Sequence, residues 1–426
     1  MLAGTIIVLL IVLLLLGTPL AFALGAVTAV YMYAAGVNLA MLAQTSTARM
    51  DSFLILAIPF FYLAGELMNG CKLTDRIVAM AKTLVGHVPG GLAQVNIFAS
   101  AIFAGMSGSA TADTAALGSV MIPAMKKEGY PPDFAAAVTV ASAMVGPIIP
   151  PSIAVVIYGA LANVSIGRLL LAGVMPGLLI IGTEMVFTYF LARRRGYPCY
   201  PRATLREMVR ASWRASAAIM FPLVIMGGIL SGVFTPTESA AVGVIYALSL
   251  GLLVYRNVQL GEIWQTFLDV AMGSVRILII VAMASSLSWI MVREQVPQDI
   301  AQLIAGVTSE PLGVLFIMIG LLFGVGLFMV ASSAEIVLTP ILVPVVVSFG
   351  IDPVHFGVLM IFVLIIGGGT PPVGVLLFVA QDIAKVPFGQ LVRAMLPYYV
   401  PLLVAVIIIA VFPQVSVWLP NLVYGP

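Results

Sequence analysis

Two interruptions in otherwise apolar sequence hold the groups best suited to binding a ligand. Residues 146–151 read GPIIPP, and residues 367–372, which lie 221 positions further on, read GGGTPP. Proline has no N–H to donate, so each Pro-Pro pair breaks a helix and leaves the preceding carbonyl groups without helical partners. Inside a bilayer these carbonyls need new partners, and an ion can supply them. The two matched breaks therefore predict a secondary transporter with a site at its centre.

A second repeated motif precedes each interruption. Residues 91–125 contain two apolar stretches of half-span length separated by GMSGSATAD, and residues 312–347 are split around ASSAE at 331–335. Small hydroxyl residues in the middle of an apolar segment are typical of a re-entrant hairpin whose tip is buried in protein. Two ordinary spans with Ser and Gly packed between helices are the alternative. The hairpin is favoured because a full crossing would reverse the orientation of every later segment.

The hairpin tips and the interruptions offer oxygen atoms of low charge. Their hydroxyl groups are those of Ser107, Ser109, Thr111, Ser332, Ser333 and Thr370. Hard oxygen ligands suit a small hard cation. Helix N-termini directed at the same space favour an anion. Together these groups predict a Na⁺-coupled carboxylate site, although the same hydroxyls could also satisfy one another.

Acidic residues in or beside apolar stretches are further functional candidates. They are Glu66, Asp113, Glu184, Glu238 and Glu335. Asp113 and Glu335 follow the hairpin tips, whereas the TPTE motif at 235–238 is typical of a turn that caps a helix. The sequence has no phosphate-binding Gly-x-x-x-x-Gly-Lys motif and no evident Ser/His/Asp or metal-ligating cluster. The chain is therefore not predicted to be an enzyme.

The amino-acid composition indicates that membrane-spanning helices position the hydroxyl, carbonyl and carboxyl groups described above. Of the 426 residues, 62% are hydrophobic and 8% are charged. Apolar runs long enough to cross about 30 Å of hydrocarbon recur from end to end. This excludes an ordinary soluble protein and predicts an all-α polytopic membrane protein, with residues 1–16 as a retained first segment. The net charge of +2 without a basic patch gives no indication of nucleic-acid binding, and the two cysteines have no metal-ligand spacing.

The lysine and arginine residues predict the orientation of the segments. If their clusters face the cytoplasm, only Arg49, Arg168 and Arg293 of the 19 basic residues lie outside. In this arrangement Arg256 and Arg276 flank a short loop. Broken helices near 133–158 and 353–380 then run in opposite directions, as an inverted repeat requires. The intervening crossings are expected near 166–192, 213–235, 237–256 and 272–292.

The offset of 221 residues extends beyond the interruptions. It also relates Pro123 to Pro344, Gly129 to Gly350, Pro132 to Pro353 and Pro176 to Pro397, without a gap. Chance accumulation of Gly and Pro is the alternative. Weakly amphipathic segments at 74–82 and 298–304 precede the hairpins and are expected along the membrane interface. The predicted division is scaffold helices and a first arm (1–88), a first core repeat (89–165), scaffold helices and a second arm (166–309), a second core repeat (310–385) and a C-terminal helix (386–426).

Several motifs together resemble those of the large membrane subunit, DctM type, of tripartite ATP-independent periplasmic (TRAP) transporters. The resemblance covers essentially the whole chain. The motifs are FLILAIPFF at 53–61 followed by AGE, VGHVPGG at 85–91, MSGSATAD at 106–113, FTPTE at 234–238 and TPPVG at 370–374.

The resemblance implies an ion-transporter-superfamily fold, in which an inverted repeat carries two re-entrant helical hairpins and two broken helices. The hairpin-bearing core would move as an elevator. It also implies Na⁺-coupled import of a small organic anion, a carboxylate or sulfonate, across the bacterial inner membrane. Two partners follow from it: a periplasmic substrate-binding protein of DctP type and a small four-helix membrane subunit of DctQ type.

The resemblance also assigns residues to sites. The first Na⁺ site would be formed by Ser107, Gly108, Ser109, Gly146, Pro147 and Pro150. The second would be formed by Ser332, Ser333, Gly367, Gly369 and Thr370. The substrate is expected beside Ser109, Thr111, Asp113, Pro151, Ser332, Pro371 and Leu376.

Two positions depart from the family pattern. Many relatives have an acidic residue near Val330, where the nearest acid here is Glu335, and many have Asn at the position of Leu376. The substrate therefore stays open. The alternatives are a symporter or antiporter of the same fold that acts without partners, a channel, and a membrane scaffold.

Overall fold

The computed structural model describes residues 2–71, 73–256 and 258–425, and within these ranges it contains helices and no strands. Met1 and Pro426, the outer limits of the first and last predicted segments, lie outside the described residues. Among the described residues, seven helices are long and apolar enough to cross a bilayer, so the chain is a multi-pass membrane protein. They are Phe53–Gly70, Ile166–Arg195, Leu205–Leu230, Pro236–Val254, Leu260–Arg293, Ala331–Ser348 and Phe388–Val411.

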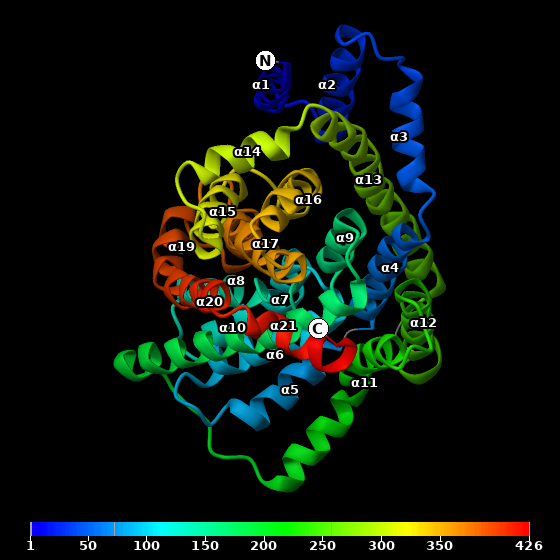
Figure 1. Cartoon of the computed structure of the whole chain (residues 1–426). Coiled ribbons are helices and arrows are strands. Elements are labelled where there is room, and N and C mark those ends of the chain that lie inside the picture. Colours follow the sequence, from blue (N-terminus) through cyan, green and yellow to red (C-terminus); the bar gives the residue numbers. More distant parts are fainter. Residues whose placement is uncertain (1, 72, 257, 426) are drawn as a thin grey trace.

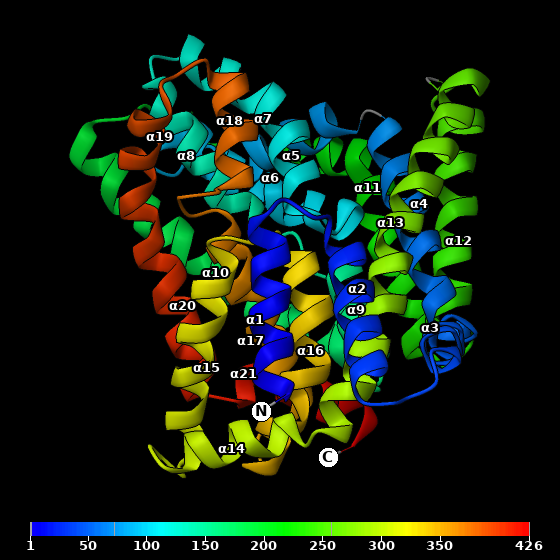
Figure 2. The ribbon, with the colours of Figure 1, turned by 90° about the horizontal axis from the view of Figure 1, so that it is seen from above.

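The amino-terminal part of the chain forms short helices along one side of the molecule (Figure 1). The first two, α1 and α2, lie side by side as a hairpin rather than as one bent span, because Gly17, with φ +82°, and Pro19 separate them. The start of α1 and the end of the chain lie at the same end of the molecule (Figure 2). The bounds are α1 Leu2–Leu15, α2 Leu20–Ala34, α3 Ala40–Met50, the 3₁₀ turn η1 Phe53–Leu56 and α4 Ala57–Gly70.

Two sets of five helices repeat along the chain. Shifting the first set by 221 residues brings the start of each helix within one residue of its counterpart, and α7 coincides with α16 at both ends. The amphipathic members α5 and α14 lie toward opposite ends of the molecule (Figure 2). The first set is α5 Thr74–Val85, α6 Gly91–Ser107, α7 Ala110–Lys127, α8 Pro132–Ala143 and α9 Ile153–Ala162. The second is α14 Val296–Ala305, α15 Pro311–Gly326, α16 Ala331–Ser348, α17 Pro353–Gly368 and α18 Val375–Ala384.

Each segment predicted as a hairpin forms two helices joined by a turn, and each predicted interruption separates two helices. In the first set α6 and α7 pack together around a turn at Gly108–Ser109, within the predicted tip. In the second set the turn covers residues 327–330, just before the predicted 331–335, so Ser332 and Ser333 lie in the first turn of α16. Helical structure stops between α8 and α9 and again between α17 and α18, as the Pro-Pro pairs predicted.

The remaining helices connect and flank these sets. Helix α12 begins with the capping box that the TPTE motif predicted: the Thr235 hydroxyl accepts from the Glu238 N–H (3.3 Å), and the Thr235 N–H donates to Glu238 Oε2 (2.8 Å). The bounds are α10 Ile166–Arg195, α11 Leu205–Leu230, α12 Pro236–Ser249, η2 Leu250–Val254, α13 Leu260–Arg293, α19 Phe388–Met395, η3 Leu396–Tyr398, α20 Tyr399–Val411 and α21 Gln414–Tyr424.

The position predicted for Arg276 is wrong. Helix α13 begins at Leu260 and not near residue 272, so Arg276 lies in the middle of a 34-residue helix instead of beside a loop. The reason is a local start signal: the Gln259 N–H donates to Glu262 Oε2 (2.9 Å), which begins the helix ahead of the apolar run. The segment from Leu260 to Met272 is too mixed in polarity for the hydropathy pattern to have marked it.

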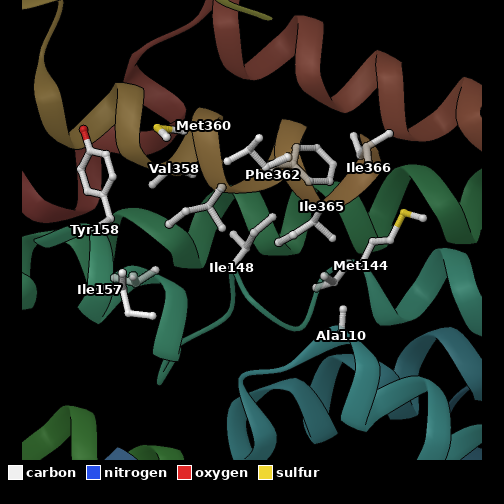
Figure 3. Close-up of a cluster of buried hydrophobic side chains, with 14 of the residues drawn as sticks. Ala110, Met144, Ile148, Ile157, Tyr158, Val358, Met360, Phe362, Ile365 and Ile366 are labelled. Atoms are coloured by element: carbon white, nitrogen blue, oxygen red, sulfur yellow. The ribbon is translucent and has the colours of Figure 1, made fainter. Parts of the chain in front are cut away.

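Helices α8 and α17 form the interior of the molecule. Every residue from Phe134 to Ala143 in α8 and from Val354 to Gly367 in α17 is buried. A helix that is apolar on all sides must be surrounded by other helices, and α17 packs against α15, α16, α10 and α9. Figure 3 shows Phe362 and Ile365 of α17 directed at Ile148 of the first interruption. The centre of the protein is thus built from the broken helices of both sets.

Helix α13 stands between this interior and the amino-terminal helices. It packs against α2, α3 and α4, and also against α16 of the second hairpin. Arg49 also joins the amino-terminal helices to the interior. From α3 it donates to the Asn163 side chain (3.2 Å) and to the Leu161 carbonyl (3.0 Å) at the end of α9. We use "scaffold" for α2, α3, α4, α11, α12 and α13, and "core" for α6–α9 and α15–α18.

Candidate functional site

A cavity of about 620 Å³ lies between the core and the scaffold. Both hairpin turns and both interruptions contribute to its wall, together with α4 and α13. The core residues that line it are Gly108, Ser109, Ala110, Thr111, Pro147, Ile153, Ala154, Ile157, Val330, Ala331, Ser332, Ser333, Glu335, Ile336, Ile361, Leu364, Ile365, Gly368, Val375 and Leu376. The scaffold residues are Tyr62, Gly273, Arg276, Ile277 and Ile280.

The first hairpin turn is built to present its oxygen atoms to this space. Gly108 ends α6 with φ +59°, a left-handed conformation that glycine adopts without strain. Ser109 then caps α7, since its hydroxyl accepts from the Ala112 N–H (3.4 Å), and the Ser107 hydroxyl accepts from the Ser109 N–H (3.2 Å). The N-terminus of α7 is therefore directed at the cavity with its capping serine in the wall.

The first turn also lies against the first interruption. A Cβ added to Gly108 would lie 3.1 Å from the Pro151 carbonyl oxygen and 3.2 Å from the Ile153 nitrogen. The structure thus brings the first turn against the backbone at residues 151–153, which directly follows Gly146, Pro147 and Pro150 of the predicted first Na⁺ site. Pro147 lines the cavity, whereas Pro151 is not among its lining residues.

Asp113 lies behind the first turn and not in the cavity wall. It is fully buried, its carboxyl group is hydrogen-bonded to the Ser107 hydroxyl, and its Oδ2 has no partner among the described residues. A Cβ added to Gly146 would lie 2.6 Å from that Oδ2. A carboxylate oxygen without a partner next to broken backbone is an arrangement that a cation would complete.

The second turn lies against the second interruption in the same manner. The Val373 N–H donates to the Leu327 carbonyl (3.4 Å), and Gly367 lies against Gly326 at the end of α15. Two predicted ligands already have partners: the Thr370 hydroxyl donates to the Ile366 carbonyl (2.6 Å), and the Gly369 carbonyl accepts from the Tyr399 hydroxyl (2.9 Å). Ser332 and Ser333 face the cavity instead.

The predicted substrate residues divide into two groups. Ser109, Thr111, Ser332 and Leu376 line the cavity, whereas Asp113, Pro151 and Pro371 are not among its lining residues. The cavity also has an acid, Glu335, which is buried and whose Oε1 has no partner within the described residues. Glu184, by contrast, is buried in α10 away from the cavity.

Sequence reasoning missed the scaffold wall. Tyr62 and Arg276 lie on α4 and α13 and face the hairpin turns across the cavity. Arg276 carried a usable signal, because a cation five residues into an apolar run is a functional candidate in a membrane helix. Tyr62 carried none, because a tyrosine in an apolar helix is ordinary.

The described residues hold no cluster of three or more His, Cys, Asp or Glu side chains that could bind a metal ion. The oxygen atoms of the turns and interruptions are instead hydroxyls and backbone carbonyls around two separate carboxyl groups. Such sets suit a weakly bound hard cation better than a resident transition metal.

A family model and several curated proteins match the chain. The model for the DctM component of tripartite ATP-independent periplasmic transporters matches residues 7–415. The sialic acid TRAP transporter large permease protein SiaM of Vibrio cholerae is 43% identical over 416 residues, with 96% of each chain covered. The C4-dicarboxylate TRAP transporter large permease protein DctM of Pseudomonas aeruginosa is 38% identical over 371 residues, with 87% of each covered.

Two further similarities concern architecture. The isethionate TRAP transporter permease protein DctMQ of Oleidesulfovibrio alaskensis is 39% identical over 401 residues, which cover 94% of this chain and 63% of that protein. Among solved structures, the Alcanivorax borkumensis YdaH transporter matches with a TM-score of 0.64 at 15% identity, covering 89% of this chain and 88% of the other. The match to the YdaH structure shows that the two proteins share a fold.

The cavity between two hairpin turns and two broken helices is consistent with a membrane carrier. The match over nearly the whole length and the permease relatives agree with this geometry. The chain belongs to the DctM family and is the large permease subunit of a TRAP transporter.

Proposed function

We propose that the chain carries out Na⁺-coupled import of a small organic anion that a periplasmic binding protein delivers. The observation that supports this best is the convergence of both hairpin turns and both interruptions on one cavity of about 620 Å³. A cavity of this size accommodates a metabolite rather than a bare ion. Its walls are mainly apolar with a few polar groups, which is the usual composition of a specific solute site.

Sodium coupling is supported by the groups next to the cavity. Each turn lies against broken backbone, and behind the first lies the buried Asp113 carboxyl group, whose Oδ2 has no partner among the described residues. Low-charge oxygen donors bind Na⁺ weakly enough for release in each cycle. The first ion would be held by the Ser107–Ser109 turn, Asp113 and the backbone at Gly146–Pro150. The second would be held near Ser332, Ser333 and the backbone at Gly367–Thr370.

An anionic substrate is supported by two observations. The N-termini of α7 and α16 carry partial positive charge and open into the cavity, and Arg276 adds a full positive charge. The relatives are named for sialic acid, C4-dicarboxylates, isethionate and 2,3-diketo-L-gulonate. Each of these solutes carries either a carboxylate or a sulfonate group.

Movement of the core against the scaffold is the proposed transport step. The repeated helix sets, whose arms α5 and α14 lie toward opposite ends of the molecule, support an inverted repeat (Figure 2). An inverted repeat gives two equivalent arrangements, one open to each side of the membrane. A core with its hairpins re-entrant in the bilayer and its cavity against α13 would slide along that helix as an elevator.

The remaining parts of the system are proposed from the family. A tripartite transporter requires two more components, and these would be a DctP-type periplasmic binding protein and a DctQ-type small membrane subunit. The relative named DctMQ, of which this chain covers 63%, supports the DctQ partner. With a periplasmic donor, the permease would lie in a bacterial inner membrane.

Reconstitution of all three components in proteoliposomes tests the proposal. Labelled N-acetylneuraminate, isethionate and succinate would be offered with and without an inward Na⁺ gradient, and at least one should accumulate only with Na⁺ and the binding protein. Equal uptake in choline buffer would contradict the coupling. Uptake by the permease alone would favour the partner-independent symporter, and single-channel currents would favour a channel.

A further inference from the structure

The scaffold side of the cavity contains a polar pair, Tyr62 and Arg276, that belongs to neither of the proposed Na⁺ sites. Four residues of α13 at positions 273, 276, 277 and 280 line the cavity, so one continuous face of this helix forms the wall. Tyr62 of α4 lines the cavity beside them. Arg276 is the basic residue of that face.

Gly273 places Tyr62 next to Arg276. A Cβ at residue 273 would lie 2.5 Å from Tyr62 Cε1 and 2.9 Å from its hydroxyl oxygen, so only glycine lets the tyrosine ring lie over α13. Arg276 follows one helical turn later on the same face. The tyrosine hydroxyl and the guanidinium group therefore belong to one polar patch on an otherwise apolar wall.

Arg276 has no hydrogen-bonding or ion-pairing partner among the residues that the structure describes. Its side chain is exposed to the cavity. Of the described residues that line the cavity, the other charged one is Glu335, which is buried in the opposite, core wall. A guanidinium group without a protein partner in the wall of a cavity, on a helix apolar enough to cross a membrane, is a candidate for binding an anion.

We propose that Arg276, assisted by the Tyr62 hydroxyl, binds the anionic group of the substrate from the scaffold side. This rests on the proposed function. The planar guanidinium group matches a carboxylate or sulfonate with two parallel hydrogen bonds. Ser109, Thr111, Ser332 and Ser333 contact the rest of the solute from the core. The counter-charge that Arg276 supplies belongs to the scaffold and stays behind when the core moves.

Chemical modification tests anion binding without transport. Phenylglyoxal reacts with accessible arginine, and peptide mass spectrometry would quantify its reaction at Arg276 and at Arg293, which lies at the end of the same helix outside the cavity. Millimolar N-acetylneuraminate, isethionate or succinate should protect Arg276 and not Arg293. Modification of Arg276 that none of the three slows would overturn the proposal.

Running the protection experiment in sodium and in choline buffers separates the two proposals. Protection in both buffers supports the role of Arg276 and contradicts Na⁺ coupling of binding. Protection that requires Na⁺ supports both. If transport does not depend on Na⁺ while the anion still protects Arg276, the proposed Na⁺ coupling is overturned and the proposed role of Arg276 is kept.

Variants test the same role in the reconstituted system. Arg276→Gln should raise the half-saturating anion concentration by about tenfold or more, the loss expected for a charge-assisted hydrogen bond. It should leave half-saturation by Na⁺ within about twofold. Arg276→Lys should recover part of the anion affinity, and Arg293→Gln should match the wild type. An unchanged anion affinity in Arg276→Gln would also overturn the proposal.

Discussion

Gly326 and Gly367 pack backbone against backbone where the second hairpin turn meets the second interruption. A Cβ on Gly367 would lie 2.7 Å from the Gly326 Cα, and a Cβ on Gly326 would lie 3.0 Å from the Gly367 Cα. No methyl group fits at either position without separating α15 from α17. The offset of 221 residues relates this pair to Gly105 and Gly146 beside the first interruption.

The first prediction concerns this contact. Gly367→Ala should destabilise the protein by about 1–3 kcal/mol, the usual cost of overpacking. Gly368→Ala is the matched control, since a Cβ there meets nothing within 4 Å. Thermal unfolding of the two purified variants in detergent measures the difference. Equal midpoints would show that α15 and α17 separate without cost.

The second prediction concerns the hydroxyl groups of the two proposed ion sites. Ser109→Ala and Thr370→Ala should each raise the Na⁺ concentration for half-maximal uptake roughly fivefold, which corresponds to about 1 kcal/mol for one lost oxygen contact. Ser119→Ala is the control, because this serine is exposed on α7 and bonds to the Ala116 carbonyl of its own helix. Unchanged Na⁺ activation in both variants, with normal expression, would refute the assignment.

The third prediction separates charge from hydrogen bonding at Asp113. Asp113→Asn keeps an oxygen that can accept from the Ser107 hydroxyl but replaces a carboxyl group, which can balance the charge of a bound cation, with a neutral amide. Stabilisation of the purified permease by Na⁺, followed as a shift in unfolding temperature without any substrate, should fall to near zero. A sodium-induced shift as large as in the wild type would mean that this carboxyl group has only a structural role.

The fourth prediction concerns the contact between scaffold and core at Arg49. Asn163 ends α9 with φ +55° and accepts a hydrogen bond from Arg49. Asn163→Gly keeps the left-handed backbone and should lose only this bond, about 1 kcal/mol. Asn163→Ala should cost about 1 kcal/mol more, because alanine is strained there. Combining each change with Arg49→Gln in a double-mutant cycle isolates the bond: the loss at residue 163 should shrink when Arg49 is absent.

Much of the fold could be predicted because its breaks are encoded by local chemistry. The prolines of the two interruptions keep α8 and α17 from continuing into α9 and α18, and Thr235 with Glu238 starts α12 by a bond within one turn. The constant spacing then related each element of one set to its counterpart. Such signals act over a few residues and need no knowledge of packing.

Other features depend on the packing of distant segments. The second turn lies at 327–330 and not at the serines that follow it, and there it contacts a segment distant in the sequence: Gly326 packs on Gly367, and the Val373 N–H donates to the Leu327 carbonyl. The start of α13 was missed because its first turns mix polar and apolar residues. The scaffold wall of the cavity could not be predicted, because Tyr62 and Arg276 are 214 positions apart and meet through Gly273.

The shortness of two helices has an electrical consequence. Helices α9 and α18 contain ten residues each, about 15 Å, which is half of a hydrocarbon layer of about 30 Å. Moving one unit charge through a whole membrane potential of 100 mV is worth about 2.3 kcal/mol. Under the proposed coupling, an ion that enters to the depth of these helix ends has crossed roughly half of that field before the core moves. Membrane voltage would then act on ion binding and on core movement alike, and each step would contribute to the current.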